Sequence, residues 1–436
     1  MTGRYKAYSE YKESGIDWIG VIPVSWSCLP IKRSFEVVNG STPRSGEKLY
    51  WDGDITWVTP ADLSKVNESI STSSKTITNE GLSSCGTSLV PKGSLILSTR
   101  APIGTIAIAS KELCTNQGCK SLIKTTSVEN KYVYYVLSIS GKQLNNLGRG
   151  TTFLELSTDE LANYRVPNPS IQEQQKIANF LDHETAKIDT LIAKQEKLIE
   201  LLKEKRQAVI SHAVTKGLNP DAPMKDSGVE WLGDVPEHWE VLPTKRFFRL
   251  VAEPSTKNHG KELLSVYAAI GVAPRKDLEQ KGNKASNTDG YWSVKKGDII
   301  VNKLLAWMGA VGYSDYDGVT SPAYDILRKT KDINPKFYHF LFRQEFTQSE
   351  FKRWSRGIME MRLRLYFEEL GRIMMPVPPK NEQDKIVAEI ESMNATFVKI
   401  EDKATKQIEL MKERKTALIS AAVTGKIDVR DWQESA

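Results

Sequence analysis

The sequence predicts an α+β protein that contains two globular α/β domains and two long helices, arranged as an internal repeat. Three observations predict this class. Strings near residue 14 recur near residue 227, two long stretches favour unbroken helix, and short β-rich runs fill the remainder. We expect globular domains at 1–170 and 218–379, with helical regions at 171–217 and 380–436.

The repeat is marked at both ends of each half. Residues 14–35 and 227–248 are identical at eleven of 22 positions. Residues 167–216 align without a gap with residues 376–425. A period this long excludes a solenoid, whose units have about 20–50 residues. The chain is therefore one unit present twice, with a pseudo-two-fold relation that suits a target with two parts.

Each half closes with a long helix. Residues 171–214 contain no Pro or Gly, Pro169 stands just before them and Gly217 just after, which are start and stop signals. About 44 residues make a rod of about 65 Å, too long for one small domain to bury. Apolar residues at heptad spacing predict that the two rods pair. The alternative is that each helix packs separately on its own half. The residues expected to pair the helices are Leu181, Ile188, Leu191, Leu198, Leu202, Ile390, Phe397, Ile400, Met411 and Leu418.

Between the repeated ends the two halves diverge. Short β-rich runs bounded by turn residues predict strands, and two amphipathic stretches predict one helix each. The expected strands are 55–59, 94–99, 105–109, 298–302 and 324–328, and the expected helices lie near 129–147 and 335–354. Arg149-Gly150 and Arg356-Gly357 are among the few shared landmarks. We interpret this as one scaffold that carries different surface residues in each half.

Composition excludes several classes of protein. The 436 residues include 60 basic and 54 acidic ones, a net charge of +6, which is only a weak indication of a polyanionic partner. No apolar run is long enough to span a membrane, and residues 1–14 lack the apolar stretch of a signal peptide, so we expect a cytoplasmic protein. The four cysteines show no zinc spacing, so we expect free thiols and no metal.

Catalytic motifs are absent from the sequence. It contains no G-x-x-x-x-G-K-[ST], G-x-S-x-G or H-E-x-x-H string, which argues against a P-loop ATPase, a serine hydrolase and a zinc protease. The string Asn168-Pro169-Ser170-Ile171 lacks the second proline and the aromatic residue with which an adenine methyltransferase would hold a flipped base. We therefore expect a protein that is not an enzyme.

The doubled strings resemble a known family. The openings SGIDWIG-x-x-P-x-x-W and SGVEWLG-x-x-P-x-x-W, the two P-x-P-x-x-x-EQ-x-KI helix starts and the two AVT endings resemble the specificity (S) subunits of Type I restriction-modification systems. In the first half, GSTPRSGEKLYWDGDITWVTPADL (40–63), STRAPIGTIAI (98–108) and TNQG (115–118) also look like one class of that family's target recognition domain.

The resemblance implies a fold and a set of partners. Two target recognition domains would be separated by two helical regions that pair as an antiparallel coiled coil, and each domain would read one half of a bipartite site in double-stranded DNA. The helices would set the spacer and dock two methyltransferase (M) subunits, which carry S-adenosylmethionine. Restriction (R) subunits, which use ATP and Mg²⁺, would join in some systems. This chain itself would bind no cofactor and would be non-catalytic.

Candidate DNA contacts follow from residue chemistry, because phosphates and base edges are bound mainly by Arg, Lys and polar donors. In the first domain the candidates are Arg44, Lys48, Tyr50, Trp51, Arg100, Arg149, Thr151 and Thr152; in the second they are Arg275, Lys276, Lys303, Lys352, Arg353, Arg356, Arg362 and Arg364. Any single arginine could equally be a solvated or ion-paired surface group. The tryptophans repeated in both halves are expected to be structural, because the two halves should read different sequences.

Two other functions remain open at this point. A structural adaptor would use the helices to organise a protein complex and the domains to bind peptides. A nuclease or methyltransferase would be an enzyme, and the missing motifs count against it. Selection of a DNA sequence would separate the first alternative from a DNA-reading protein.

Overall fold

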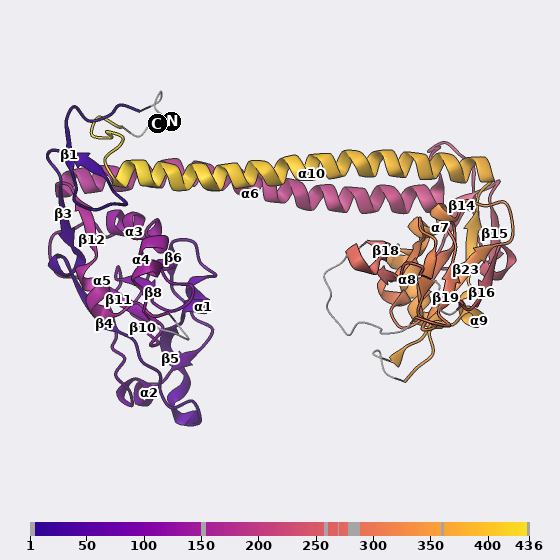
Figure 1. Ribbon diagram of the computed structural model, residues 1–436, viewed down its shortest axis with the longest axis horizontal. Coiled ribbons are helices and arrows are strands. Elements are labelled where there is room, and N and C mark those ends of the chain that lie inside the picture. The colour runs from indigo at the N-terminus through magenta and orange to yellow at the C-terminus, as the bar shows by residue number, and fades with distance from the viewer. Residues whose placement is uncertain are drawn as a thin grey trace. The chain divides into compact units, whose positions relative to one another are not determined.

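The computed structural model describes residues 5–149, 154–256, 260–268, 270–277, 288–358 and 362–433. The chain forms two compact units. The first combines residues 1–195 with 406–436, and the second is the continuous segment 196–405. Each unit therefore holds one globular domain together with part of both long helices. Figure 1 shows the elements in chain order.

The first globular domain is centred on a five-stranded sheet with the order β4-β11-β8-β9-β6. All its neighbours are antiparallel except β6 and β9. A smaller sheet has the order β10-β5-β7, and β1-β2 and β12-β3 are two-stranded. The strands are β1 (Tyr11–Glu13), β2 (Val21–Pro23), β3 (Ser27–Pro30), β4 (Phe35–Asn39), β5 (Trp51–Val58), β6 (Ser69–Ile70), β7 (Thr76–Ile77), β8 (Leu95–Ser98), β9 (Ile106–Ala109), β10 (Cys114–Thr115), β11 (Cys119–Lys124) and β12 (Arg165–Asn168). The helices are η1 (Ile31–Arg33), η2 (Lys48–Tyr50), α1 (Pro60–Leu63), α2 (Asn79–Ser83), α3 (Asn130–Ser138), α4 (Gly141–Leu147) and α5 (Thr158–Asn163).

The second globular domain has a four-stranded antiparallel sheet with the order β16-β23-β20-β21. Four two-stranded ribbons, β13-β14, β15-β24, β17-β18 and β19-β22, complete it. The strands are β13 (Met224–Asp226), β14 (Asp234–Pro236), β15 (Glu240–Pro243), β16 (Phe248–Val251), β17 (Leu264–Tyr267), β18 (Gly271–Pro274), β19 (Trp292–Val294), β20 (Ile299–Asn302), β21 (Val311–Tyr313), β22 (Gly318–Thr320), β23 (Tyr324–Lys329) and β24 (Met374–Val377). The helices are η3 (Thr244–Arg246), η4 (Arg275–Asp277), η5 (Ala306–Met308), α7 (Pro335–Phe342), α8 (Glu345–Trp354) and α9 (Phe367–Leu370).

The two sheets share one framework. The strand β8 lies between β11 and β9, as β20 lies between β23 and β21. Within the first sheet Leu95 faces Leu122, and within the second Ile299 faces Leu327. These four side chains are fully buried, so matching positions fill the two cores. The two mixed domains confirm the predicted α+β repeat, and their sheets are mainly antiparallel rather than parallel.

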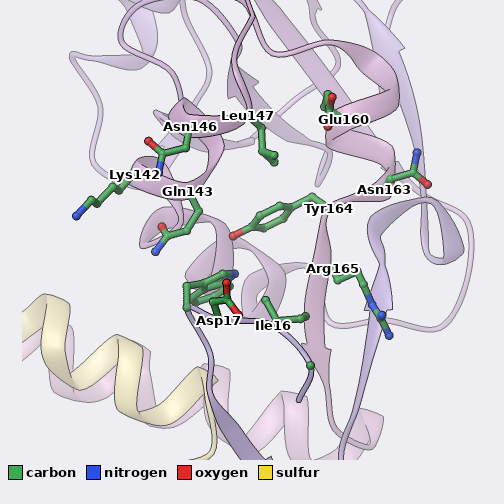
Figure 2. Close-up of a pocket in the computed structure, with 12 residues that line it drawn as sticks. Ile16, Asp17, Lys142, Gln143, Asn146, Leu147, Glu160, Asn163, Tyr164 and Arg165 are labelled. Carbon is green, nitrogen blue, oxygen red and sulfur yellow. The ribbon is translucent and has the colours of Figure 1, made fainter. Parts of the chain in front are cut away.

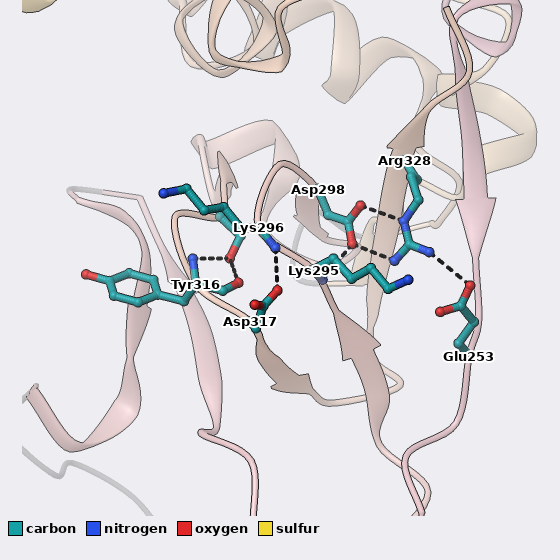
Figure 3. Close-up of polar contacts among 8 residues, drawn as sticks. Glu253, Lys295, Lys296, Asp298, Tyr316, Asp317 and Arg328 are labelled. Carbon is teal, nitrogen blue, oxygen red and sulfur yellow. Dashed lines mark hydrogen bonds and ion pairs between the residues drawn. The ribbon is translucent and has the colours of Figure 1, made fainter.

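A charged group lies inside the second domain. Asp298 has a side chain only 3% exposed, and it accepts hydrogen bonds from Arg328 Nε and Nη2, both at 2.8 Å. The backbone N–H of Lys295 donates to the same carboxylate at 2.8 Å, and Arg328 Nη1 reaches Glu253 at 2.9 Å. Figure 3 shows this network at the start of β20. The matching residues of the first domain are Ser94 and, by sheet register, Ile123.

The long helices α6 (Ile171–Lys216) and α10 (Lys380–Val423) have 46 and 44 residues. In the first unit Lys415 Nζ is 2.7 Å from Asp189, and Lys176 Nζ donates to the carbonyl of Arg430 at 2.5 Å. In the second unit Arg206 Nε donates to Asn394 Oδ1 at 2.8 Å. Within the first unit, earlier residues of α6 thus face later residues at the C-terminal end, which is an antiparallel arrangement. Pairing as a coiled coil along the whole length stays a prediction.

The predicted apolar seam is only partly buried. Leu181, Ile188, Ile390 and Leu418 are buried, Leu202, Phe397 and Met411 are half-buried, and Leu191, Leu198 and Ile400 are exposed. Ala404, a further small residue at the predicted heptad spacing, is buried, and Ile192 and Ile408 are buried although they were not predicted to pair the helices. A strict seven-residue repeat drifts around a straight helix by about 20° per heptad, so the buried face moves to neighbouring residues.

Both long helices end at a glycine that packs on a repeated hairpin. Gly217 (φ 78°) and Gly425 (φ 72°) adopt the left-handed conformation usual just past a helix end. A Cβ atom on Gly217 would lie 3.3 Å from Trp239, and one on Gly425 would lie 3.3 Å from Trp26 and 2.6 Å or less from Pro23. Both tryptophans are fully buried, which agrees with the structural role expected of repeated residues.

The prediction of one helix in each amphipathic stretch is wrong in one respect, because each stretch forms two helices. The first breaks into α3 and α4 at Ile139-Ser140, where the Ser140 hydroxyl donates to the carbonyl of Val136 at 2.7 Å. Gly141 then begins α4, and glycine is a poor residue for a helix interior. The second breaks into α7 and α8 at Arg343-Gln344. Each break lets the second helix leave the direction of the first.

Candidate nucleic-acid interface

In the first domain, the Gly/Ser/Pro-rich loop before β5 carries Arg44 and Lys48, and both side chains are exposed. Tyr50 and Trp51, at the end of this loop, are half-buried. The indole N–H of Trp51 donates to the carbonyl of Arg44 at 3.1 Å, and its ring meets that of Trp57 edge-on at 5.1 Å. Trp51 therefore fixes the loop, while the two cations point to solvent.

This loop is tied to the loop 115–118. The hydroxyl of Thr42 donates to the side chain of Gln117, and the indole N–H of Trp57 donates to the carbonyl of Ser41 at 2.9 Å. The carbonyl of Gly118 in turn accepts the N–H of Thr99, at the end of β8, at 2.8 Å. Three segments separated in sequence thus meet at one end of the sheet. Gln117 was not among the predicted contacts.

Arg100 follows β8 and forms an ion pair with Glu155, with Nε at 3.0 Å and Nη2 at 2.9 Å from one carboxylate oxygen. Arg149 lies beside the same glutamate in a backbone bridge, and its guanidinium pairs with Glu160 at 2.5 Å. Sequence reasoning did not find these acidic partners. The predicted contacts Thr151 and Thr152 lie outside the described residues.

A buried lysine supports the same end of the domain. Lys120 Nζ donates to Asn39 Oδ1 at 2.9 Å, and the hydroxyl of Thr158 donates to the same oxygen at 2.8 Å. Burial lowers the pKa of Lys120, and the carboxylate of Glu155 opposes that effect. The lysine thus joins β4, β11 and α5, an internal support that the sequence did not reveal.

In the second domain, the predicted lysines and the first arginine are held by neighbours. Lys303, only 20% exposed at its side chain, donates to the carbonyl of Pro322 at 2.9 Å and lies 3.4 Å from Asp325. Burial raises the pKa of Asp325, and Lys303 opposes this. Lys276 pairs with Glu262 at 2.8 Å, and Arg275 is half-buried at the start of η4.

The basic stretch 352–364 contains both paired and unpaired cations. Lys352 Nζ lies 5.1 Å from the ring centroid of Trp307, and Arg353 pairs with Glu350 at 2.8 Å. Arg356 forms an ion pair with the buried carboxylate of Glu369. Arg362 and Arg364 are exposed, and neither has a carboxylate partner in the part of the chain that the structure describes. They are the most available cations of this stretch.

A pocket of about 640 Å³ lies in the first domain beside the repeated segment that contains Trp18. Figure 2 shows Tyr164 pointing into it, between Gln143 of α4 and the residues around Asp17. Trp18 stacks on Tyr164 with 6.3 Å between centroids, and burial raises the pKa of Tyr164 to about 12. The matching Trp231 stacks on Phe346 at 5.8 Å. The pocket thus belongs to the packing of the repeated segment on its domain.

The residues that the structure describes include free cysteines but form no metal-binding cluster and no membrane-spanning helix. Cys28, Cys114 and Cys119 are buried free thiols, and Cys85 is a half-buried one. Burial raises the pKa of Cys114 to about 12. Within the described ranges, no three His, Cys, Asp or Glu side chains gather in a way that could hold a metal ion. No helix among the described residues is long and apolar enough to cross a membrane.

The chain matches the family described as Type I restriction modification DNA specificity domain twice, over residues 23–201 and 236–410. Each match takes in most of one globular domain and the first part of the helix that follows it. The two matches together cover most of the sequence. The chain therefore belongs to this family.

Curated relatives agree with this assignment. The chain is 38% identical over 204 residues to the Type I restriction enzyme MjaIX specificity subunit of Methanocaldococcus jannaschii, an alignment that spans 46% of each chain. It is 24% identical over 338 residues to the EcoDI specificity subunit of Escherichia coli, covering 72% of this chain and 73% of that one. Specificity subunits are non-catalytic, and this chain is accordingly not an enzyme.

Solved structures share the fold. A structure described as showing complex assembly and conformational transition of the type I R-M system aligns with a TM-score of 0.65 and 14% identity, covering 93% of this chain and 99% of that one. The HsdS subunit from Thermoanaerobacter tengcongensis aligns with a TM-score of 0.53 and 14% identity, covering 93% and 98%.

Proposed function

We propose that this chain reads a bipartite site in double-stranded DNA for a Type I restriction-modification complex, with one half-site bound by each globular domain. The observation that carries the proposal is that one sheet framework occurs twice with different polar loops at the same end. Two similar scaffolds with unlike contact residues suit a target whose two halves differ in sequence. Base edges are distinguished by the side chains presented to them.

The partners and cofactors belong to the same proposal. The long helices set the spacer between the half-sites and dock two methyltransferase subunits, which carry S-adenosylmethionine. Restriction subunits with ATP and Mg²⁺ join where they are present. This chain holds no cofactor of its own and works in the cytoplasm, where the DNA is. The repeated helix starts and ends support two docking sites of the same kind.

The test is methylome sequencing of a strain that carries this chain with its methyltransferase partner. We expect one methylated motif with two specified halves and a fixed spacer. A strain with the methyltransferase alone is the control. Methylation at an unsplit motif, or none that depends on this chain, would contradict the proposal.

A second candidate is a coiled-coil adaptor that binds proteins rather than DNA, favoured by the charged faces of α6 and α10. It predicts that the assembled complex enriches no sequence from a library of random-core duplexes. Selection with such a duplex library therefore separates the two functions.

A further inference from the structure

Both domains have a similar bridged loop, which follows α4 in the first domain and α8 in the second. We call this loop the arm (residues 149–155 and 356–364). At its base in the first domain, Arg149 and Glu155 exchange two backbone N–H···O bonds, each 3.0 Å long. In the second domain Arg356 and Arg364 do the same at 2.9 Å. The residues at the bases of the arms are described, and 150–153 and 359–361 lie outside the described residues.

Each arm is fixed to the same place on its sheet. The N–H after the first arm, that of Leu156, donates to the carbonyl of Thr99 at 2.9 Å. The N–H after the second arm, that of Leu365, donates to the carbonyl of Lys303, also at 2.9 Å. Thr99 and Lys303 are the residues that directly follow β8 and β20. Both leucines are fully buried, so the two arm bases have matching positions.

The first arginine of each arm also has a matching partner. Arg149 pairs with Glu160 in α5, and Arg356 pairs with Glu369 in α9. Each glutamate lies five residues after the last residue of its arm. The side chain of Glu369 is only 6% exposed, so its charge requires a partner. A residue with the same partner in both domains cannot account for a difference between the two half-sites.

The last residue of the arm differs between the domains. It is Glu155 in the first, where it pairs with Arg100, the residue after Thr99. In the second domain the residue after Lys303 is Leu304, and Arg364 takes the place of the glutamate. Each domain thus has a second arginine at the base of its arm, Arg100 in one and Arg364 in the other, at different positions in the sequence.

We propose that Arg100 and Arg364 are specificity-determining residues that each bind a guanine in the half-site of their own domain, while Arg149 and Arg356 are positioning residues. The inference rests on the proposed function. Arginine binds guanine O6 and N7 with two donors. One oxygen of Glu155 accepts hydrogen bonds from Nε and Nη2 of Arg100. The N–H donors of Nη1 and the second N–H of Nη2 are then left for a guanine base.

The test is selection of random-core duplexes by the chain assembled with its methyltransferase partner, followed by sequencing. We expect Arg100→Ala to remove the preference for guanine at one position of one half-site, and Arg364→Ala to do so at one position of the other. The expected loss of discrimination is about 5- to 150-fold at that position only. The matched control is Arg372→Ala, which removes an exposed arginine two residues after α9 and should change nothing.

The positioning role has a different signature. We expect Arg356→Ala to weaken binding to every sequence without changing the preferred one, and to speed hydrogen exchange at the Leu365 amide. Arg356→Lys, which keeps a cation for Glu369, should restore both. A changed base preference in Arg356→Ala would overturn this role.

The outcomes distinguish the two proposals. If the unaltered complex enriches no sequence, the proposed function fails. If it enriches a bipartite site, and Arg100→Ala and Arg364→Ala both enrich that site with every position intact, the proposed function stands and the guanine-reading residues are overturned.

Discussion

At the scale of single residues, the two domains have different side chains at one matching pair of positions in their sheets. In the second domain the buried carboxylate of Asp298 pairs with the half-buried Arg328, where the first domain has Ser94 and Ile123. Buried pairs are often no more stable than apolar residues of similar volume, but breaking one leaves an uncompensated charge. The first domain therefore supplies a natural uncharged replacement for the ion pair of the second.

We expect Arg328→Ile to destabilise the second domain by about 3–5 kcal/mol, because it strands the carboxylate of Asp298. The double variant Asp298→Ser with Arg328→Ile should recover most of that loss. Urea unfolding of both variants and the unaltered chain measures it. A double variant as unstable as the single one would show that the stranded charge is not the cause.

His339, a half-buried residue of α7 whose imidazole ring faces the protein interior, also has a measurable consequence. Its Nδ1 accepts the backbone N–H of Tyr313 at 3.2 Å. Burial lowers the pKa of His339 to about 3, with the positive charges of Arg343 and Lys336 adding to the effect. The native imidazole is therefore neutral over a range in which the imidazole of the unfolded chain, with a pKa near 6.5, becomes protonated.

The stability of the second domain should therefore depend on pH through His339. The unfolded chain binds a proton that the native state excludes between about pH 6.5 and 3, so stability is complete above pH 6.5 and falls as the pH drops below it, by up to about 1.4 kcal/mol per pH unit. We expect His339→Asn to flatten this decline between pH 7 and 4.5 in urea unfolding. A stability difference between variant and parent that is constant with pH would refute the assignment.

At the scale of elements, the loop that precedes β5 is the best candidate for contact with phosphates, since Arg44 and Lys48 are exposed on a loop held by Trp51. We expect Arg44→Ala with Lys48→Ala to weaken binding of the complex to all sequences alike. Each lost phosphate contact should reduce the slope of log affinity against log salt by about 0.9.

The matched control for this loop is Lys92→Ala with Lys111→Ala. This control removes the same charge from two exposed residues. Lys92 lies before the start of β8 and Lys111 lies after the end of β9. An equal change of salt slope in both double variants would mean that the effect is general to the domain's charge.

The long helices yield a prediction about the spacer. Inserting four residues after Lys194 in α6 and after the matching Lys403 in α10 lengthens each helix by about 6 Å, close to two base pairs of DNA. We expect the methylated motif to gain a longer spacer with unchanged half-sites. The same insertion after Asn219, in the loop beyond α6, should leave the spacer as it was. An unchanged motif in the helix variant would show that the length of the helices does not set the spacer.

At the scale of the whole molecule, the features that could be predicted are those that depend on residues close together in the sequence. Duplicated strings and long runs without Pro or Gly are visible directly, and they predicted two similar halves and two long helices. The ion pairs Arg100–Glu155 and Arg356–Glu369 were not predicted, because they depend on how strands and arms are placed in three dimensions. The exposure of Leu191 and burial of Ile192 reflect the drift of a heptad pattern on a straight helix.

The glycine-capped ends of the two helices bear on the order in which the chain folds as it is made. The hydroxyl of Tyr11 donates to the carbonyl of Gly425, and the N–H of Asp428 donates to the carbonyl of Lys6. The second unit is one continuous segment, so it can close while synthesis is still under way. The first unit is completed by residues 406–436, which are made only after the whole of the second unit, and until then Trp26 lacks its contact with Gly425. Residues 1–195 are therefore made before the second unit and finish folding after it.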